Sequence, residues 1–143
     1  MTAQKIFNNF RGSWLVNRDF EGRLNGRAKG VAKFEFGGDQ ALNYHEDLTV
    51  TFITGASYNA RREYIYTCNE QTISKWIDKT NYFDFNFNAS GNEACGIYNC
   101  SNDTYRATYN FINDDHFTLK YHVQGPTKNY VINSQYFRPC LRL

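Results

Sequence analysis

The sequence contains few of the residues on which disulfide scaffolds, metal centres and membrane spans depend. It has four cysteines, one methionine and two prolines in 143 residues. Cys68, Cys95, Cys100 and Cys140 are too few and too irregularly spaced for a disulfide scaffold or a CxxC pair of zinc ligands, so reduced thiols are expected. No window approaches the length of a membrane span, and charges interrupt the first twenty positions, where a signal peptide needs an apolar core. We therefore expect a cytoplasmic protein without a metal, a cofactor or a membrane anchor.

An excess of charge of one sign is also missing. The chain has 16 Lys and Arg against 14 Asp and Glu, a net charge of +2, and the basic residues are scattered. Proteins that bind nucleic acid or an anionic membrane surface concentrate positive charge in a stripe or patch. Neither kind of partner is expected here.

Aromatic residues, in contrast, are abundant. The chain has 11 tyrosines, 12 phenylalanines and two tryptophans. Such residues favour pleated, half-buried surfaces, so the composition is typical of a β protein. A chain of 143 residues forms one domain by ordinary size and buries roughly two thirds of its unfolded surface, which is enough for a core without a metal or a disulfide. We expect a single domain over residues 1–143.

Alternation of apolar and polar residues dominates the chain after residue 12. In residues 41–54, for example, Leu42, Tyr44 and Leu48 share one face. Similar runs predict strands at 14–21, 28–36, 41–54, 58–67, 72–78, 81–88, 103–112, 116–124 and 128–138. Consecutive strands joined by short turns close into an up-and-down barrel, which removes exposed sheet edges. The predicted fold is all-β: one antiparallel β-barrel of about eight to ten strands.

Two segments depart from this alternation. Residues 1–12 hold helically spaced Ile6, Phe7 and Phe10, which predicts a short N-terminal helix and a lead-in to the first strand. Residues 89–102 are polar and contain glycine, and they are predicted to form the longest loop, a rim or lid of the barrel.

The first and last predicted strands carry a recognisable pair of motifs. Gly12-Ser13-Trp14 stands at the start of the first strand, and Tyr136-Phe137-Arg138 stands at the end of the last. This arrangement resembles the lipocalin and fatty-acid-binding (calycin) barrels, in which a Gly-x-Trp tryptophan packs under a late arginine at the closed end. The resemblance implies that Trp14 and Arg138 close the barrel structurally, through a cation–π contact between the first strand and the last.

A closer resemblance spans nearly the whole chain. The segments that carry it are Phe10-Arg11-Gly12-Ser13-Trp14, Tyr44-His45-Glu46, Arg62-Glu63-Tyr64-Ile65-Tyr66, Cys100-Ser101-Asn102-Asp103-Thr104-Tyr105, Gly125-Pro126-Thr127-Lys128-Asn129-Tyr130 and Tyr136-Phe137-Arg138. Together they resemble a family of small, functionally uncharacterised proteins that are regarded as lipocalin-like. That family usually has a histidine two residues before the cysteine, where this chain has Tyr98. The resemblance therefore implies a fold and leaves the chemistry open.

A charged residue on the inward face marks the candidate site. Glu46 lies between Tyr44 and Leu48 on the apolar face of residues 41–54, and a buried carboxylate is costly unless it is paired. Arg62, on the facing strand, is the predicted partner. If both side chains point inward, the barrel holds a charge pair surrounded by phenols.

Tyrosines are predicted to line the same interior. The candidate ligand-binding residues are Glu46 and Arg62 together with Tyr44, Tyr64, Tyr66, Tyr105, Tyr109 and Tyr121. Phenols put a hydroxyl on a rigid apolar body, which suits a small aromatic or anionic ligand. The leading hypothesis is thus small-molecule binding in a barrel cavity.

Two other interpretations stay open. In the first, Glu46 and Arg62 only satisfy each other, the tyrosines fill a solid core, and the protein is a structural module with a protein partner or a second copy of itself. In the second, the protein is an enzyme acting on a ligand in the cavity. The sequence favours binding over catalysis: His45, His116 and His122 fall on outer faces, and Cys100 lacks a histidine or a cation to activate it.

Overall fold

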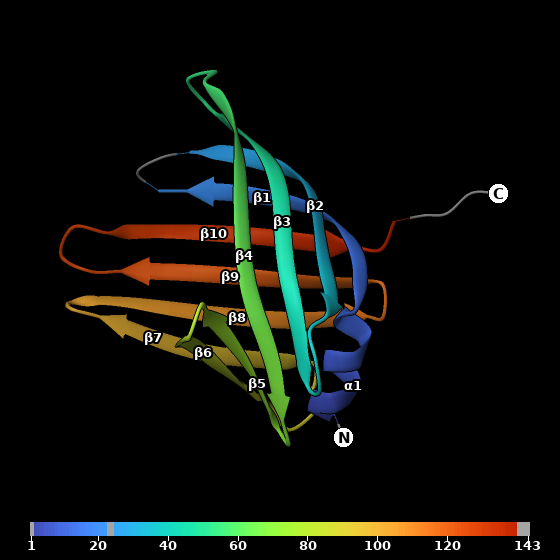
Figure 1. Cartoon of the computed structure of the whole chain (residues 1–143). Helices are drawn as coiled ribbons and strands as arrows, with labels where there is room; N and C mark the ends of the chain where they lie inside the picture. The colour runs from blue at the N-terminus through green and yellow to red at the C-terminus, as the bar shows by residue number, and fades with distance from the viewer. Residues whose placement is uncertain (1, 23–24, 140–143) are drawn as a thin grey trace.

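Ten antiparallel strands and one helix make up the part of the chain that the computed structural model describes, residues 2–22 and 25–139 (Figure 1). The elements are α1 Thr2–Phe10, β1 Gly12–Glu21, β2 Gly26–Phe36, β3 Ala41–Phe52, β4 Ser57–Asn69, β5 Thr72–Ile77, β6 Thr80–Phe87, β7 Glu93–Cys100, β8 Asp103–Asn113, β9 His116–Gln124 and β10 Asn129–Phe137. Each strand pairs with its neighbour in sequence, and β1 pairs with β10 to close the barrel. The predicted lipocalin-like β-barrel with a short N-terminal helix is confirmed.

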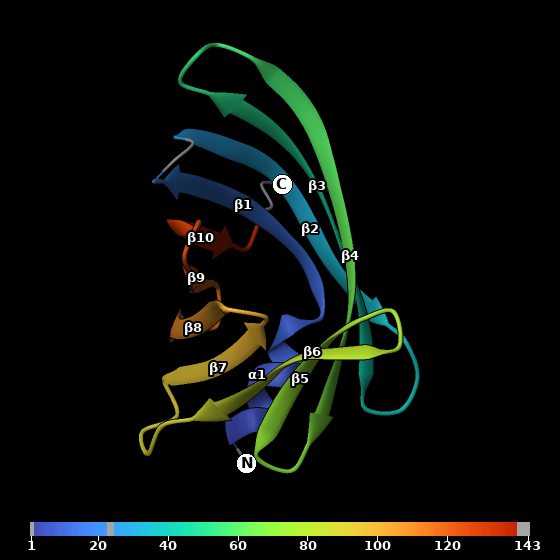
Figure 2. The ribbon, with the colours of Figure 1, turned by 90° about the vertical axis from the view of Figure 1, so that its left-hand side faces the viewer.

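The barrel wall differs in strength around its circumference. Long ladders join β1 to β2, β2 to β3 and β3 to β4, and the last of these runs from Ala41↔Thr67 to Thr51↔Ser57. In contrast, the ladder between β4 and β5 is short and involves Ile65–Asn69 of β4, and β6 is joined to β7 by two residue pairs. Residues 57–64 of β4 therefore extend beyond the short β5–β6 hairpin, as Figure 2 shows.

The segment predicted as the longest loop is the one clear error in the strand assignment. Residues 89–102 contain β7, which pairs with β8 from Glu93↔Asn110 to Cys100↔Asp103. The inward residues of β7 include Ala94 and Gly96, which are too small to produce a strong hydrophobic alternation. The packing requires a small residue there, because a Cβ on Gly96 would lie 2.9 Å from the carbonyl oxygen of Asp84.

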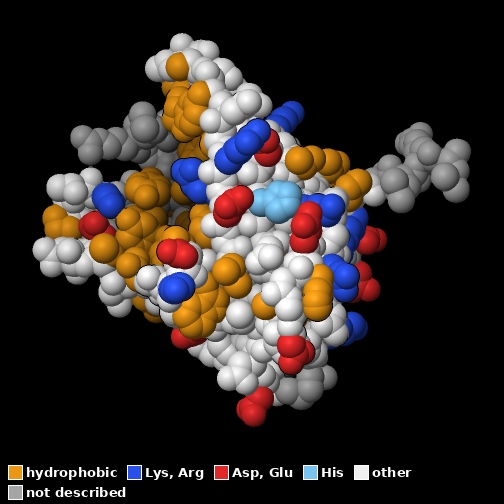
Figure 3. All heavy atoms as spheres, viewed as in Figure 1, with side chains coloured by type: hydrophobic (Ala, Val, Ile, Leu, Met, Phe, Trp, Pro, Cys, Tyr) orange, Lys and Arg blue, Asp and Glu red, His pale blue; other side chains and the backbone are white. Residues whose placement is uncertain are grey.

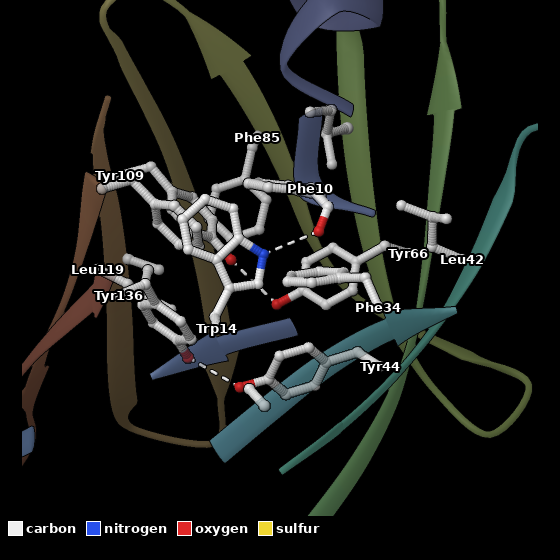
Figure 4. Close-up of a cluster of buried hydrophobic side chains, with 14 of the residues drawn as sticks. Phe10, Trp14, Phe34, Leu42, Tyr44, Tyr66, Phe85, Tyr109, Leu119 and Tyr136 are labelled. Atoms are coloured by element: carbon white, nitrogen blue, oxygen red, sulfur yellow. Dashed lines mark hydrogen bonds between the residues drawn. The ribbon is translucent and has the colours of Figure 1, made fainter. Parts of the chain in front are cut away.

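Helix α1 closes one end of the barrel. Its buried face consists of Ala3, Phe7 and Phe10, which recur at helical spacing. The ring of Phe10 stacks on Phe34 with centroids 4.7 Å apart and contacts Phe117 at 5.2 Å. Figure 4 shows Phe10 and Phe34 packed among the labelled side chains of Tyr66, Phe85 and Tyr109, so the barrel has a solid core under α1.

Trp14 and Arg138 join the first and last strands next to the helix. The guanidinium carbon of Arg138 lies 3.8 Å from the centre of the Trp14 ring. Arg138 also donates hydrogen bonds to the carbonyl oxygens of Asn9, Arg11 and Ser13, and the Trp14 indole donates one to Phe10 over 2.8 Å. The expected cation–π contact is present, and the arginine additionally ties down the chain between α1 and β1.

Gly12 permits this arrangement. It has φ +115°, a region that side chains disfavour, and a Cβ there would lie 3.0 Å from Nη1 of Arg138. The glycine of the Gly-x-Trp motif thus serves two purposes, since it turns the chain from α1 into β1 and leaves room for the arginine.

Candidate functional site

A cavity of about 300 Å³ lies in the barrel beyond the aromatic core. Eight of the 11 tyrosines line it, together with Arg18, Glu46, Arg62 and Lys75. A second hollow of about 400 Å³ shares Phe20, Tyr58, Tyr130 and Ile132 with the first, and forms its mouth. Figure 3 shows hydrophobic side chains around this hollowed part of the surface, at the tip of the β3–β4 hairpin and the neighbouring strand ends.

Arg18 and Glu46 form a two-point ion pair on the cavity wall. Arg18 Nη1 lies 2.7 Å from Glu46 Oε2, and Nη2 lies 3.0 Å from Oε1. The arginine also donates to Ser134 Oγ over 2.7 Å and to the hydroxyl of Tyr136 over 3.2 Å. Paired charges held in this forked geometry tolerate burial far better than single charges do.

The predicted partner of Glu46 is therefore wrong. Arg62 is the cross-strand neighbour of Glu46 and lines the cavity as expected, but its side chain is exposed and donates to the carbonyl oxygen of Arg61. Arg18 of β1 takes its place, because only β2 separates β1 from β3 in the barrel wall and Arg18 lies on the inward face that begins at Trp14. From there its guanidinium makes both hydrogen bonds to Glu46, whereas the Arg62 side chain is exposed.

The pair holds Glu46 in its charged form. Burial alone favours the neutral acid, and Glu46 is only 4% exposed. Hydrogen bonding and attraction from Arg18, with a 2.5 Å hydrogen bond from the Tyr44 hydroxyl, outweigh burial and keep the pKa of Glu46 below its usual value. The hydroxyl of Tyr44 also lies 2.8 Å from that of Tyr136. A dashed line marks this hydrogen bond in Figure 4.

Lys75 is a second buried cation in the same cavity. It lies on β5, it is 3% exposed, and its ammonium nitrogen donates to the Tyr121 hydroxyl over 2.5 Å. The nitrogen also lies 3.9 Å from the centre of the Tyr64 ring. Within residues 2–22 and 25–139, no carboxylate makes an ion pair with it.

This environment weakens the basicity of Lys75. Burial lowers the pKa of the amine to about 7, and repulsion from Arg18 acts in the same direction, while attraction to Glu46 opposes both. The neighbouring phenol of Tyr121 behaves in the opposite way, because burial raises its pKa well above the usual range. At neutral pH the cavity thus holds a protonated phenol beside an amine that is divided between its charged and neutral forms.

The predicted tyrosines fall into two groups. Tyr44, Tyr64, Tyr105 and Tyr121 line the cavity. Tyr66 and Tyr109 do not, and the prediction is wrong for them: their hydroxyls lie 2.9 Å apart in the core under α1, where both rings contact Phe10. Alternation indicated inward faces for Tyr44, Tyr105, Tyr109 and Tyr121 and left the face of Tyr64 and Tyr66 open, and it contains no information on depth along the barrel axis.

The sequence did contain a signal for the two residues that were missed. Arg18 follows Trp14 and Val16 on one face of β1, and Lys75 follows Ile73 on the inward face of β5. Both cations share the parity of buried neighbours, which places them inward. A search for buried residues by hydrophobicity does not select Arg18 and Lys75, because both are charged and lie in short alternating segments.

Metal ligands and membrane spans are the remaining features to place. Nowhere in the described part of the chain do three His, Cys, Asp or Glu residues gather in a metal-binding arrangement. Cys68 is buried, while Cys95 and Cys100 are exposed thiols, and Cys140 lies outside the described residues. The helix in the described residues is too short and too polar to cross a membrane.

Comparison with known proteins places this fold. The S-type phycobiliprotein lyase CPES from Guillardia theta superimposes with a TM-score of 0.75 over 99% of this chain and 95% of that one, at 8% identity. A redesigned β-barrel, mFAP1, bound to DFHBI, superimposes with a TM-score of 0.50 over 93% of this chain and 98% of its own, at 11% identity. These likenesses show a shared fold. No curated protein matches the sequence.

The sequence itself identifies a family. The family model covers the strands that build the cavity and both residues of the Trp14–Arg138 contact. The match extends over residues 10–138, and the chain therefore belongs to DUF6314, a family of unknown function.

Proposed function

We propose that the protein binds a small aromatic molecule with an anionic group inside the barrel. The observation that carries this proposal is Lys75: a buried lysine that faces a tyrosine-lined cavity and has no carboxylate partner among the described residues. The ring of the ligand packs between tyrosine faces, and its anionic group meets the ammonium of Lys75.

The charge balance of the cavity supports an anionic ligand. Arg18 and Glu46 neutralise each other and Arg62 is exposed, so protonated Lys75 leaves one unbalanced buried positive charge among aromatic rings. A buried charge without a counterion is costly, and a carboxylate, sulfonate or phenolate from the ligand removes that cost. Binding of an anion therefore raises the pKa of Lys75 toward its ordinary value.

The dimensions of the cavity set the size of the ligand. A volume of about 300 Å³ is at the lower end of the range for small-molecule sites, which suits a compact molecule of a few rings. The mouth around Tyr58 and Tyr130 offers further apolar surface to a longer substituent. The redesigned barrel mFAP1, which shares this fold, is bound to DFHBI, and this supports ligand binding by a barrel of this kind.

Two fluorescent probes that differ only in the presence of a sulfonate group test the proposal. 8-Anilinonaphthalene-1-sulfonate carries an anionic group, and N-phenyl-1-naphthylamine has the same ring system without it. We expect one molecule of the sulfonate to bind per chain, and we expect Lys75→Met to weaken its affinity by about tenfold or more, equivalent to about 1.4 kcal/mol. The affinity for the neutral probe should change by no more than about threefold, since a methionine keeps the apolar stem.

The matched control is Lys120→Met, which removes an exposed lysine from the outer face of β9. Equal weakening by Lys120→Met and Lys75→Met would show that the probe binds on the surface, and would contradict the proposal. Failure of both probes to bind the folded wild-type protein would favour a structural role. Native mass spectrometry of the purified protein then distinguishes a co-purified small molecule from a co-purified protein partner.

A further inference from the structure

Lys75 differs from the other lysines in the described structure in both burial and partners. Lys5, Lys29, Lys33, Lys79 and Lys120 are exposed. Lys128 also contacts a tyrosine, donating to Tyr105 over 3.0 Å, but it forms an ion pair with Asp103 at 3.4 Å. Lys75 alone among them combines a cavity position, near-complete burial and the absence of an acidic partner.

We propose that Lys75 forms a covalent imine with an aromatic aldehyde held in the barrel cavity. This inference rests on the proposed function, because the same cavity must first bind the aromatic ring. It adds a chemical class to that function: a ligand with a reactive carbonyl in place of, or in addition to, an anionic group.

The geometry places the groups that imine formation needs. Lys75 lines the cavity, so a ligand held there lies next to this side chain. The Tyr121 hydroxyl lies 2.5 Å from that nitrogen, and the Tyr64 ring lies beneath it at 3.9 Å. Imine formation requires a nucleophile and a nearby group that can give and receive a proton. Lys75 supplies the nucleophile, and the Tyr121 hydroxyl supplies the proton donor and acceptor.

The reaction balances with the groups present. The nitrogen lone pair of Lys75 attacks the carbonyl carbon, and the carbonyl oxygen takes up a proton to give a carbinolamine. The nitrogen then loses a proton, the hydroxyl group leaves as water after protonation, and a carbon–nitrogen double bond forms. One aldehyde and one amine yield one imine and one water, so no oxidant or reductant is involved. Tyr121 is in position to pass the proton between nitrogen and oxygen.

Lys75 and Lys128 differ in the protonation state of their amines at neutral pH. Burial lowers the pKa of Lys75 to about 7, so a large fraction is the neutral, nucleophilic amine at pH 7.5. The hydrogen bond to Tyr105 and the contact with Asp103 instead raise the pKa of Lys128 to about 12, which keeps it a non-nucleophilic ammonium. Selectivity for Lys75 thus follows from the environment of each amine.

Reductive trapping tests this inference. The probe is 6-methoxy-2-naphthaldehyde, added to the folded wild-type protein at pH 7.5 with cyanoborohydride, which converts an imine to a stable secondary amine. Peptide mapping by mass spectrometry then locates the adduct. We expect one adduct per chain, on Lys75, formed at least about tenfold faster than on any other lysine. Lys128→Met should label like the wild type, and Lys75→Met should lose the fast adduct.

The matching alcohol, 6-methoxy-2-naphthalenemethanol, separates this inference from the proposed function, because it has the same rings and cannot form an imine. If aldehyde and alcohol both displace the bound sulfonate probe but labelling is equal over all lysines, the imine proposal is wrong and the binding proposal stands. If neither displaces the probe and Lys75 is not labelled, the aromatic cavity site fails as well. The wild-type peptide map gives the decision without depending on how any variant folds.

Discussion

Replacing Arg18 by methionine is expected to destabilise the protein strongly, whereas the same change at Arg62 is not. Both arginines line the cavity, but only Arg18 binds Glu46, through contacts of 2.7 and 3.0 Å. Its side chain is 15% exposed, so the pair lies mostly out of water. Removing one member of such a pair leaves a buried carboxylate without compensation and costs about 3–5 kcal/mol.

That magnitude is a large part of the total stability of a typical domain, about 5–15 kcal/mol. Urea unfolding measures it directly: with a slope of about 1–3 kcal/mol per molar urea, Arg18→Met should lower the midpoint by about 1–5 M. Arg62→Met should change the free energy of unfolding by no more than about 0.5 kcal/mol, because Arg62 is exposed.

Two outcomes would refute the reasoning. Equal effects of the two substitutions would mean that Glu46 is not held by Arg18 in solution. A stable Arg18→Met variant with an unchanged pKa of Glu46 would mean that the buried carboxylate needs no partner. A double variant, Arg18→Met with Glu46→Leu, should recover much of the lost stability, since it removes both charges together.

Three further predictions concern the closed end and Lys75. Trp14→Ala removes the fully buried indole under Arg138 and should lower the Tm by on the order of 10 °C, with the affinity for the sulfonate probe little changed, as calorimetry and fluorescence titration will show. Gly12→Ala should lower the free energy of unfolding by more than Gly38→Ala does, because both glycines have positive φ but only Gly12 faces Arg138. The pKa of Lys75 is lowered from 10.5 to about 7 on folding, so the unfolded chain binds more protons between these values. The free energy of unfolding should therefore rise with pH between 7 and 10, by about 1 kcal/mol per pH unit more in the wild type than in Lys75→Met.

Each of these has a distinct contradictory result. An unaltered Tm in Trp14→Ala would remove the closure role of the Trp14–Arg138 contact. Equal losses in the two glycine variants would show that backbone strain, and not the space for Arg138, makes Gly12 necessary. Parallel pH profiles for wild type and Lys75→Met would show that Lys75 keeps its ordinary pKa in the folded protein.

The fold could be predicted from the sequence because inward-facing apolar residues alternate with outward-facing polar residues along the strands of a barrel. Along β3, buried and exposed residues alternate without a break from Leu42 to Val50. The same period failed in β7, where the inward residues Ala94 and Gly96 are small and close packing against β6 leaves no room for a side chain at Gly96. A strand whose inward face must be small looks like a loop to any test based on hydrophobicity.

The site could be predicted only in part, because local alternation does not show which side chains of different strands pair inside the barrel. Glu46 was identified by its position on an apolar face, which is a property of one strand. Its partner depended on which of two arginines on nearby strands turns inward toward it, and this requires the register of β1, β2, β3 and β4 together. Lys75 was missed for a related reason: only the closed barrel shows that, among the described residues, the lysine forms no ion pair with a carboxylate and lies close to Tyr64 and Tyr121.

The central claim is that an aromatic anion binds inside the barrel against Lys75, and the ionisation of that amine reports on it most directly. With ¹³C-labelled lysine, NMR titration gives the pKa of each amine, and the resonance missing from Lys75→Met assigns Lys75. We expect a pKa near 7 in the free protein and an increase of at least about one unit in the complex with 8-anilinonaphthalene-1-sulfonate, equivalent to about 1.4 kcal/mol of favourable interaction. An unchanged Lys75 pKa in a saturated complex would contradict the account.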